Sequence, residues 1–124
     1  MKTWHLWISI ALVLTGCQTD ARPLPISDLE ITRAKLAVAN TLRDPESARF
    51  VGRIFKLQTK NGTEIVCGKV NAKNGFGGYG GPMGFGYIVN TDTAYIFGQD
   101  DTNMSLLNPE SLSAVNECSS GLIS

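Results

Sequence analysis

The stretch FVGRIFKLQTKNGTEIVCGKV, residues 50–70, decides the fold class of this chain. Two runs rich in β-branched and aromatic residues flank Asn61-Gly62, a dipeptide typical of tight hairpin turns because both residues tolerate positive φ. The pattern predicts strands over 50–59 and 64–70, joined by a turn at 60–63.

A loop of only Asn61 and Gly62 would fix the register of this hairpin. Leu57 would then lie opposite Val66, and Lys56 opposite Cys67. Because side chains alternate between the faces of a strand, one face would carry Phe55, Leu57, Val66 and Val70, and the other Ile54, Ile65 and Cys67. We therefore expect both faces of the sheet to be at least partly covered.

Upstream of the hairpin, the sequence predicts a helix from about 28 to 42. Ser27 and Glu30 have the spacing of a capping box, and Asp44-Pro45 ends the segment. Apolar residues recur at helical spacing on one face: Ile31, Ala34, Val38 and Leu42. We expect this face to pack on the sheet.

Downstream, a second strand pair is expected over 85–90 and 93–98. Asn108, Pro109 and Glu110 supply a cap, a first-turn proline and an acid for a last helix over about 109–118. A stripe of Leu112, Val115 and Cys118 would face the sheet. Together these elements predict an α+β fold with an N-terminal helix, about four mainly antiparallel strands in two hairpins, a short C-terminal helix and one disulfide.

The N-terminus has the layout of an export signal. Lys2 precedes an apolar run over 6–14, about half the ~20 residues of a membrane-spanning helix, and the run ends in Leu-Thr-Gly-Cys17. This ending resembles the lipobox of bacterial lipoproteins. The resemblance implies cleavage before Cys17 and attachment of fatty acids there, which anchors the chain to an envelope membrane facing the periplasm. Gln18, rather than Asp, favours the outer over the inner membrane; an ordinary secretory signal is the alternative.

These features divide the chain into a signal peptide over 1–16, a lipidated tether over 17–26 and a single domain over 27–124. Cleavage leaves 108 of 124 residues, with ten basic and eleven acidic side chains. A net charge of −1 argues against nucleic acid as a partner.

His5, the one histidine, leaves with the signal. The mature chain therefore lacks the imidazole of a Ser-His-Asp triad, of a Cys-His pair or of a metal site. We expect no enzymatic activity, no cofactor and no metal. Asp100–Asn103 offers oxygens for Ca²⁺ but is more typical of a solvated loop, and nothing in the sequence brings together the carboxylates considered for hydrolysis, which are Glu46, Glu64 and Asp92.

With Cys17 lipidated, Cys67 and Cys118 remain as an even pair in an oxidising compartment. We predict that they form a disulfide. A redox-active pair is the alternative, but the two cysteines lack C-x-x-C spacing.

The glycine-rich residues 71–86 are the most distinctive segment. As a functional site, Asn71, Lys73, Asn74 and Tyr79 would form a polar binding patch with the backbone N–H groups. As a purely structural segment, its asparagines would satisfy backbone groups while Phe76 and Tyr79 pack.

Two motifs carry a second resemblance. D-P-x-S-A-x-F over 44–50 and C-G-K-V-N-A-K-N-G-F-G-G-Y-G over 67–80 resemble a pattern in small, uncharacterised exported and phage-associated proteins of proteobacteria. This resemblance implies a shared fold and supplies no activity.

The leading hypothesis is a membrane-anchored, non-enzymatic binding module that recognises an envelope protein or an incoming toxin or phage component. Two alternatives stay open. One is a structural or assembly lipoprotein of the envelope or of a secretion or phage-related system. The other is a hydrolase that uses two carboxylates.

Overall fold

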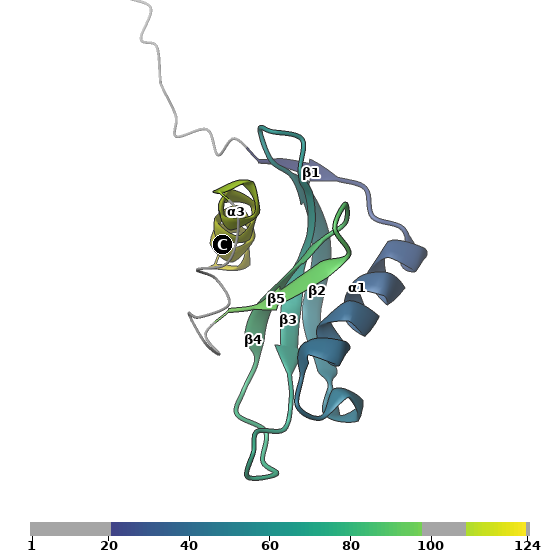
Figure 1. The fold of residues 1–124 in the computed structure, drawn as a ribbon, viewed down its shortest axis with the longest axis vertical. Coiled ribbons are helices and arrows are strands. Elements are labelled where there is room, and N and C mark those ends of the chain that lie inside the picture. The colour runs from purple at the N-terminus through teal and green to yellow at the C-terminus, as the bar shows by residue number, and fades with distance from the viewer. Residues whose placement is uncertain (1–20, 98–108, 124) are drawn as a thin grey trace, which may run out of the picture.

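Five strands form one antiparallel sheet with a helix packed against each face (Figure 1). The computed structural model describes residues 21–97 and 109–123. The elements are β1 (Arg22–Leu24), α1 (Asp28–Thr41), the 3₁₀ helix η1 (Pro45–Ser47), β2 (Arg49–Gln58), β3 (Glu64–Asn71), β4 (Met83–Ile88), β5 (Thr93–Ile96) and α3 (Pro109–Ile123). Each strand pairs with the next one along the chain. The predicted α+β class is confirmed.

Helix α1 begins at the predicted capping box. Ser27 Oγ accepts a hydrogen bond from the Glu30 N–H at 3.2 Å, and the Glu30 carboxylate accepts one from the Ser27 N–H at 2.9 Å. Ala34 and Val38 are fully buried and Leu42 is buried. The predicted apolar face of the helix therefore packs on the sheet.

The β2–β3 hairpin forms with a longer loop than the two residues considered above. The Gly62 N–H donates to Thr59 O at 2.9 Å, and the Thr59 N–H donates to Thr63 O at 2.9 Å. The loop thus holds three residues, a turn closed by Gly62 at φ 85°. The predicted hairpin with a turn at 60–63 is confirmed, whereas the two-residue loop considered for it is wrong.

This longer loop shifts the register by one residue. Leu57 lies opposite Ile65, and Phe55 opposite Cys67. Because a one-residue shift exchanges the faces of a strand, Phe55 and Leu57 share a face with Ile65 and Cys67 rather than with Val66 and Val70. The predicted grouping of side chains is therefore wrong, although both faces are covered as expected.

Helix α3 covers the face that carries Ile65 and Cys67. The predicted disulfide joins Cys67 of β3 to Cys118 of α3, with Cα atoms 5.6 Å apart. Val115 is buried as expected, whereas Leu112 is 37% exposed. The helix continues to Ile123, beyond the predicted end, because its last turn packs on the sheet.

Residues 22–24 form an edge strand where the sequence analysis predicted an extended tether. Arg22 lies opposite Gln58, and Leu24 opposite Lys56. Proline is tolerated at a sheet edge because an outward-facing N–H is not needed there. The predicted tether over 17–26 therefore includes part of the folded domain.

The second predicted hairpin also forms, as β4 and β5. Strand β4 begins and ends two residues earlier than predicted, and Asp92 occupies the turn with φ 50°. Residues 98–108 lie outside the described part of the chain.

An ion pair fastens the first turn of α1 to β2. Lys56 Nζ lies 2.6 Å from Glu30 Oε1, and the lysine is 8% exposed. The hydrogen bond from Lys56, together with that from the Ser27 N–H, lowers the pKa of Glu30 from 4.5 to about 2. The carboxylate thus caps the helix and holds it to the sheet at once.

Candidate functional site

The glycine-rich segment between β3 and β4 forms a loop with its own hydrogen bonds. The Asn74 N–H donates to Gly78 O at 2.7 Å, and Asn74 O accepts from the Gly77 N–H at 3.0 Å. Asn74 Oδ1 also accepts from the N–H groups of Phe76 at 3.0 Å and Gly78 at 3.2 Å. Asparagine side chains make such local bonds readily. The tip of the loop therefore has a defined backbone.

The base of the loop is fastened to η1 and β2. The Tyr79 hydroxyl donates to Ser47 O at 3.2 Å, and the Lys73 N–H donates to Ser47 Oγ at 3.1 Å. Lys73 and Tyr79 also pair as an isolated antiparallel bridge. The Arg49 guanidinium lies 4.4 Å from the centroid of the Tyr79 ring, a cation–π contact.

Phe76 stands at the tip of this loop and is 99% exposed. The structural interpretation of this segment is therefore wrong about Phe76, which does not pack, whereas its expectation that the asparagines satisfy backbone groups is confirmed at Asn71 and Asn74. Burial of such a ring stabilises a folded chain by roughly 1.5–3 kcal/mol. The Phe76 ring makes no such contribution within the described part of the molecule. An exposed aromatic ring on a fixed backbone is typical of an interaction site.

A cleft of about 600 Å³ lies between this loop and the end of α1. Its lining residues are Thr41, Leu42, Arg43, Lys73, Asn74, Gly75 and Phe76. A Cβ on Gly75 would lie 2.7 Å from Arg43 Nη1, so the guanidinium lies directly against the loop backbone. Among residues 21–97 and 109–123, no carboxylate lies within 4.0 Å of the Arg43 or Lys73 nitrogens. Both charged side chains that line the cleft are therefore basic and lack an ion-pair partner among these residues.

The four residues predicted for a binding patch divide into two pairs. Lys73 and Asn74 line the cleft. Asn71 Oδ1 accepts a hydrogen bond from the Gly81 N–H at 3.2 Å, and Tyr79 is held by η1 and β2 as described. The second pair thus supports the loop rather than lining the cleft.

Sequence analysis missed Arg43 and did not place Phe76 in the patch. Two weak features of the sequence could have pointed to these residues. Arg43 follows directly on the end of the predicted helix, and Phe76 is a large apolar residue among glycines, outside any strand or helix periodicity. Such a residue has no regular element to carry it into a core.

The carboxylates considered for hydrolysis are engaged elsewhere or held apart. Glu46 lies in η1, before β2, whereas Glu64 pairs with Gln58 at the other end of β2. The strand between them spans about 30 Å. Asp92 accepts a hydrogen bond from the Tyr87 hydroxyl at 2.5 Å. Burial of the hydroxyl, and to a smaller extent this hydrogen bond, raises the pKa of Tyr87 to about 12.

Within the described ranges, His, Cys, Asp and Glu side chains form no group of three or more that could hold a metal. The Asp100–Asn103 run weighed as a calcium loop lies outside those ranges, as does Cys17. Over the same ranges, the helices are too short or too polar to cross a membrane.

Comparison of the chain with protein-family models, with curated proteins and with solved structures finds no match. A functional proposal therefore rests on the geometry of the loop and its cleft.

Proposed function

We propose that this chain is a lipid-anchored envelope protein that acts as a non-enzymatic binding module and recognises a partner protein through its glycine-rich loop. The observation that carries the proposal is Phe76, which is 99% exposed on a loop held by Asn74 and Tyr79. A loop ordered before binding loses less entropy on association. Aromatic side chains are also enriched among the residues that dominate interfaces.

Arg43 and Lys73 indicate the chemistry of that partner. Both line the cleft beside Phe76, and neither is neutralised by a carboxylate of the described residues. A partner surface with carboxylates around an apolar depression would complement them. Such complementarity speeds encounter and selects the partner more than it raises affinity.

The course of the chain supports a display role. Strand β1 begins at Arg22 opposite Gln58, so the chain coming from Cys17 joins the sheet at that end. The glycine-rich loop lies at the opposite end (Figure 1), about 30 Å away along β2. A lipid on Cys17 would hold one end of the sheet near the membrane, and Phe76 would face away from it.

Site-specific photo-crosslinking in the native host tests the recognition surface. A benzophenone-bearing phenylalanine at position 76 should give a discrete crosslinked product. The matched control is the same group at Leu36, which is 63% exposed on α1 and should give none. Equal labelling from both positions, or no product from position 76, would contradict the proposal.

Intact-mass measurement of protein from the native host tests the anchor. The expected species begins at Cys17 and carries fatty acids. A species that retains residues 1–16, or that lacks fatty acid, would remove the membrane attachment while leaving the crosslinking result to decide the recognition surface.

A further inference from the structure

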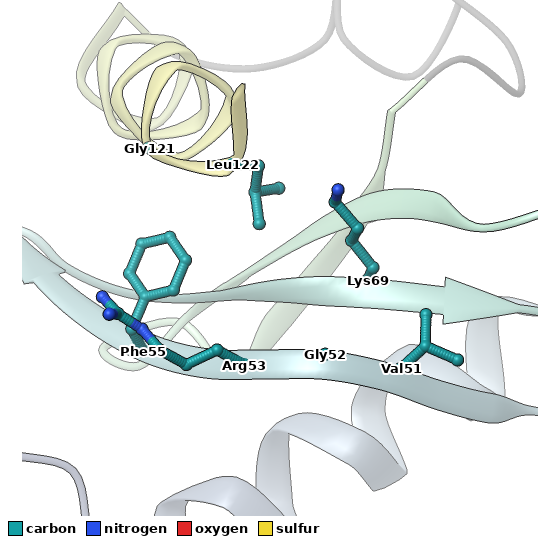
Figure 2. A pocket seen from close by; sticks show the side chains of 7 residues that line it. All are labelled: Val51, Gly52, Arg53, Phe55, Lys69, Gly121 and Leu122. Atoms are coloured by element: carbon teal, nitrogen blue, oxygen red, sulfur yellow. The ribbon is translucent and has the colours of Figure 1, made fainter. Parts of the chain in front are cut away.

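A second cleft, of about 360 Å³, lies on the α3 side of the sheet, between the last turn of α3 and strands β2 and β3 (Figure 2). It is lined by Val51, Gly52, Arg53, Phe55, Lys69, Gly121 and Leu122. It shares no lining residue with the cleft beside Phe76. It is thus a separate place for a ligand.

A β-bulge creates this cleft. Val51 lies opposite Lys69, and Phe55 lies opposite Cys67. Between these two pairs β2 advances by four residues and β3 by only two, which is the irregularity of a bulge. Gly52 has φ 73°, and a Cβ there would meet nothing within 4 Å. The bulge therefore leaves the backbone between Val51 and Phe55 uncovered by side chains at Gly52.

Apolar side chains form part of the cleft wall. The Phe55 ring rises from β2 toward the last turn of α3, and the Leu122 side chain points down toward the sheet (Figure 2). A Cβ on Gly121 would lie 3.2 Å from the Phe55 ring, so the helix closes tightly on one side. The side chains of Phe55 and Leu122 offer apolar contact to an alkyl chain.

Two cations border the same space. Lys69 extends from β3 toward Leu122 (Figure 2), and the Arg53 guanidinium lies 5.2 Å from the centroid of the Phe55 ring. In the part of the chain that the structure describes, neither has a carboxylate within 4.0 Å. The C-terminal end of α3 contributes roughly half a negative charge, whereas the described side chains that line the cleft contribute two positive charges. The cleft therefore favours an anion.

We propose that this cleft binds a small amphiphilic carboxylate, with its acyl chain between Phe55 and Leu122 and its head group at Lys69. At roughly 30 Å³ for each water-sized group, the volume holds about a dozen non-hydrogen atoms. An acyl chain of about eight carbons with its carboxylate has this size. Charge complementarity selects the carboxylate, and the side chains of Phe55 and Leu122 select the acyl chain.

NMR titration of the ¹⁵N-labelled mature chain tests this proposal, with Cys17→Ser so that no attached lipid competes. The mature chain, residues 17–124, includes every described helix and strand. Octanoate should shift the amides of Gly52, Lys69 and Leu122 saturably. Acetate, which lacks the chain, and octanol, which lacks the charge, should each bind at least about tenfold more weakly.

Lys69→Met should weaken octanoate binding about tenfold, because one charge-assisted hydrogen bond is lost. Lys60→Met makes the same change at an exposed site in the β2–β3 turn and should leave binding unchanged. Arg53→Met provides a second test if Lys69→Met alters the fold. Octanol binding as tightly as octanoate, equal affinity in all variants, or shifts that do not saturate would overturn the proposal.

Discussion

The β3–β4 hairpin has a packed end, by which we mean its paired strands beneath α3, and a loop end, residues 72–82, and the two use glycine for opposite reasons. Beneath α3, a Cβ on Gly84 would lie 2.6 Å from the Phe97 ring and 3.0 Å from a Leu122 methyl group. In the loop, a Cβ on Gly80 would meet nothing within 4 Å. The first glycine allows close packing, whereas the loop uses glycine to turn the backbone, as at Gly77 with φ 80°.

The two ends also differ in what holds them. Beneath α3, Ile65, Cys67 and Ile88 are buried around a disulfide. In the loop, backbone groups bond to Asn74 and the Tyr79 hydroxyl bonds to η1, while the tip is exposed. Stability is therefore concentrated at the packed end. The loop end is free to carry recognition.

Removing the disulfide should produce the largest effect. Cys67→Ala with Cys118→Ala frees a loop of fifty residues and should lower the free energy of unfolding by about 4 kcal/mol. Urea denaturation of the oxidised protein and of the double variant measures this difference. Reductant should destabilise the native protein and leave the variant unchanged; an equal response in both would contradict the assignment.

A matched pair of glycine substitutions compares the ends directly. Gly84→Ala should cost about 2 kcal/mol, because the Phe97 ring and Leu122 must move. Gly80→Ala should be neutral or stabilise by up to about 1 kcal/mol, since it only restricts the unfolded chain. Thermal unfolding followed by circular dichroism measures both. Equal losses would show that the loop is as tightly packed as the sheet.

The Glu30–Lys56 ion pair, on the α1 face of the sheet, should make the free energy of unfolding depend on pH. The folded-state pKa of Glu30 is lowered to about 2, so its stabilisation is present above pH 4.5 and is lost as pH falls from 4.5 toward 2. Glu30→Gln should cost about 1–2 kcal/mol at neutral pH, a value reduced by partial exposure. Urea titrations at several pH values should show this difference disappear near pH 2. Glu46→Gln, on an exposed residue, is the control, and a cost for Glu30→Gln that is independent of pH would contradict the linkage.

The sequence predicted α1, the β2–β3 hairpin and the start of α3 because their signals are local. A capping box, an Asn-Gly turn and a first-turn proline each act within a few residues. The register of β2 and β3 was not predictable in this way, because it depends on whether Thr59 pairs with Thr63. Strand β1 was also hidden, since its partner Gln58 lies 36 residues away and Pro23 argues against a strand.

The candidate site was harder to predict because its parts are distant in sequence. Lys73 and Asn74 stand out as polar residues beside glycines, but Arg43 reaches Gly75 only through the fold. The exposure of Phe76 follows from the absence of neighbours around the tip in the described structure. No local pattern encodes that absence.

Phe76→Ala gives the smallest expected effect on stability and the sharpest test of the contrast between the ends. A ring that is 99% exposed contributes little to the folded state, so the free energy of unfolding should change by less than about 0.5 kcal/mol. Capture of the partner identified by crosslinking should nevertheless be lost, whereas Leu36→Ala should retain it. A loss of stability above about 1 kcal/mol would mean that the ring packs in solution. If stability is unchanged and capture of the partner is intact, recognition must lie elsewhere on the molecule. The Phe76 ring would then contribute neither to the stability of the fold nor to binding.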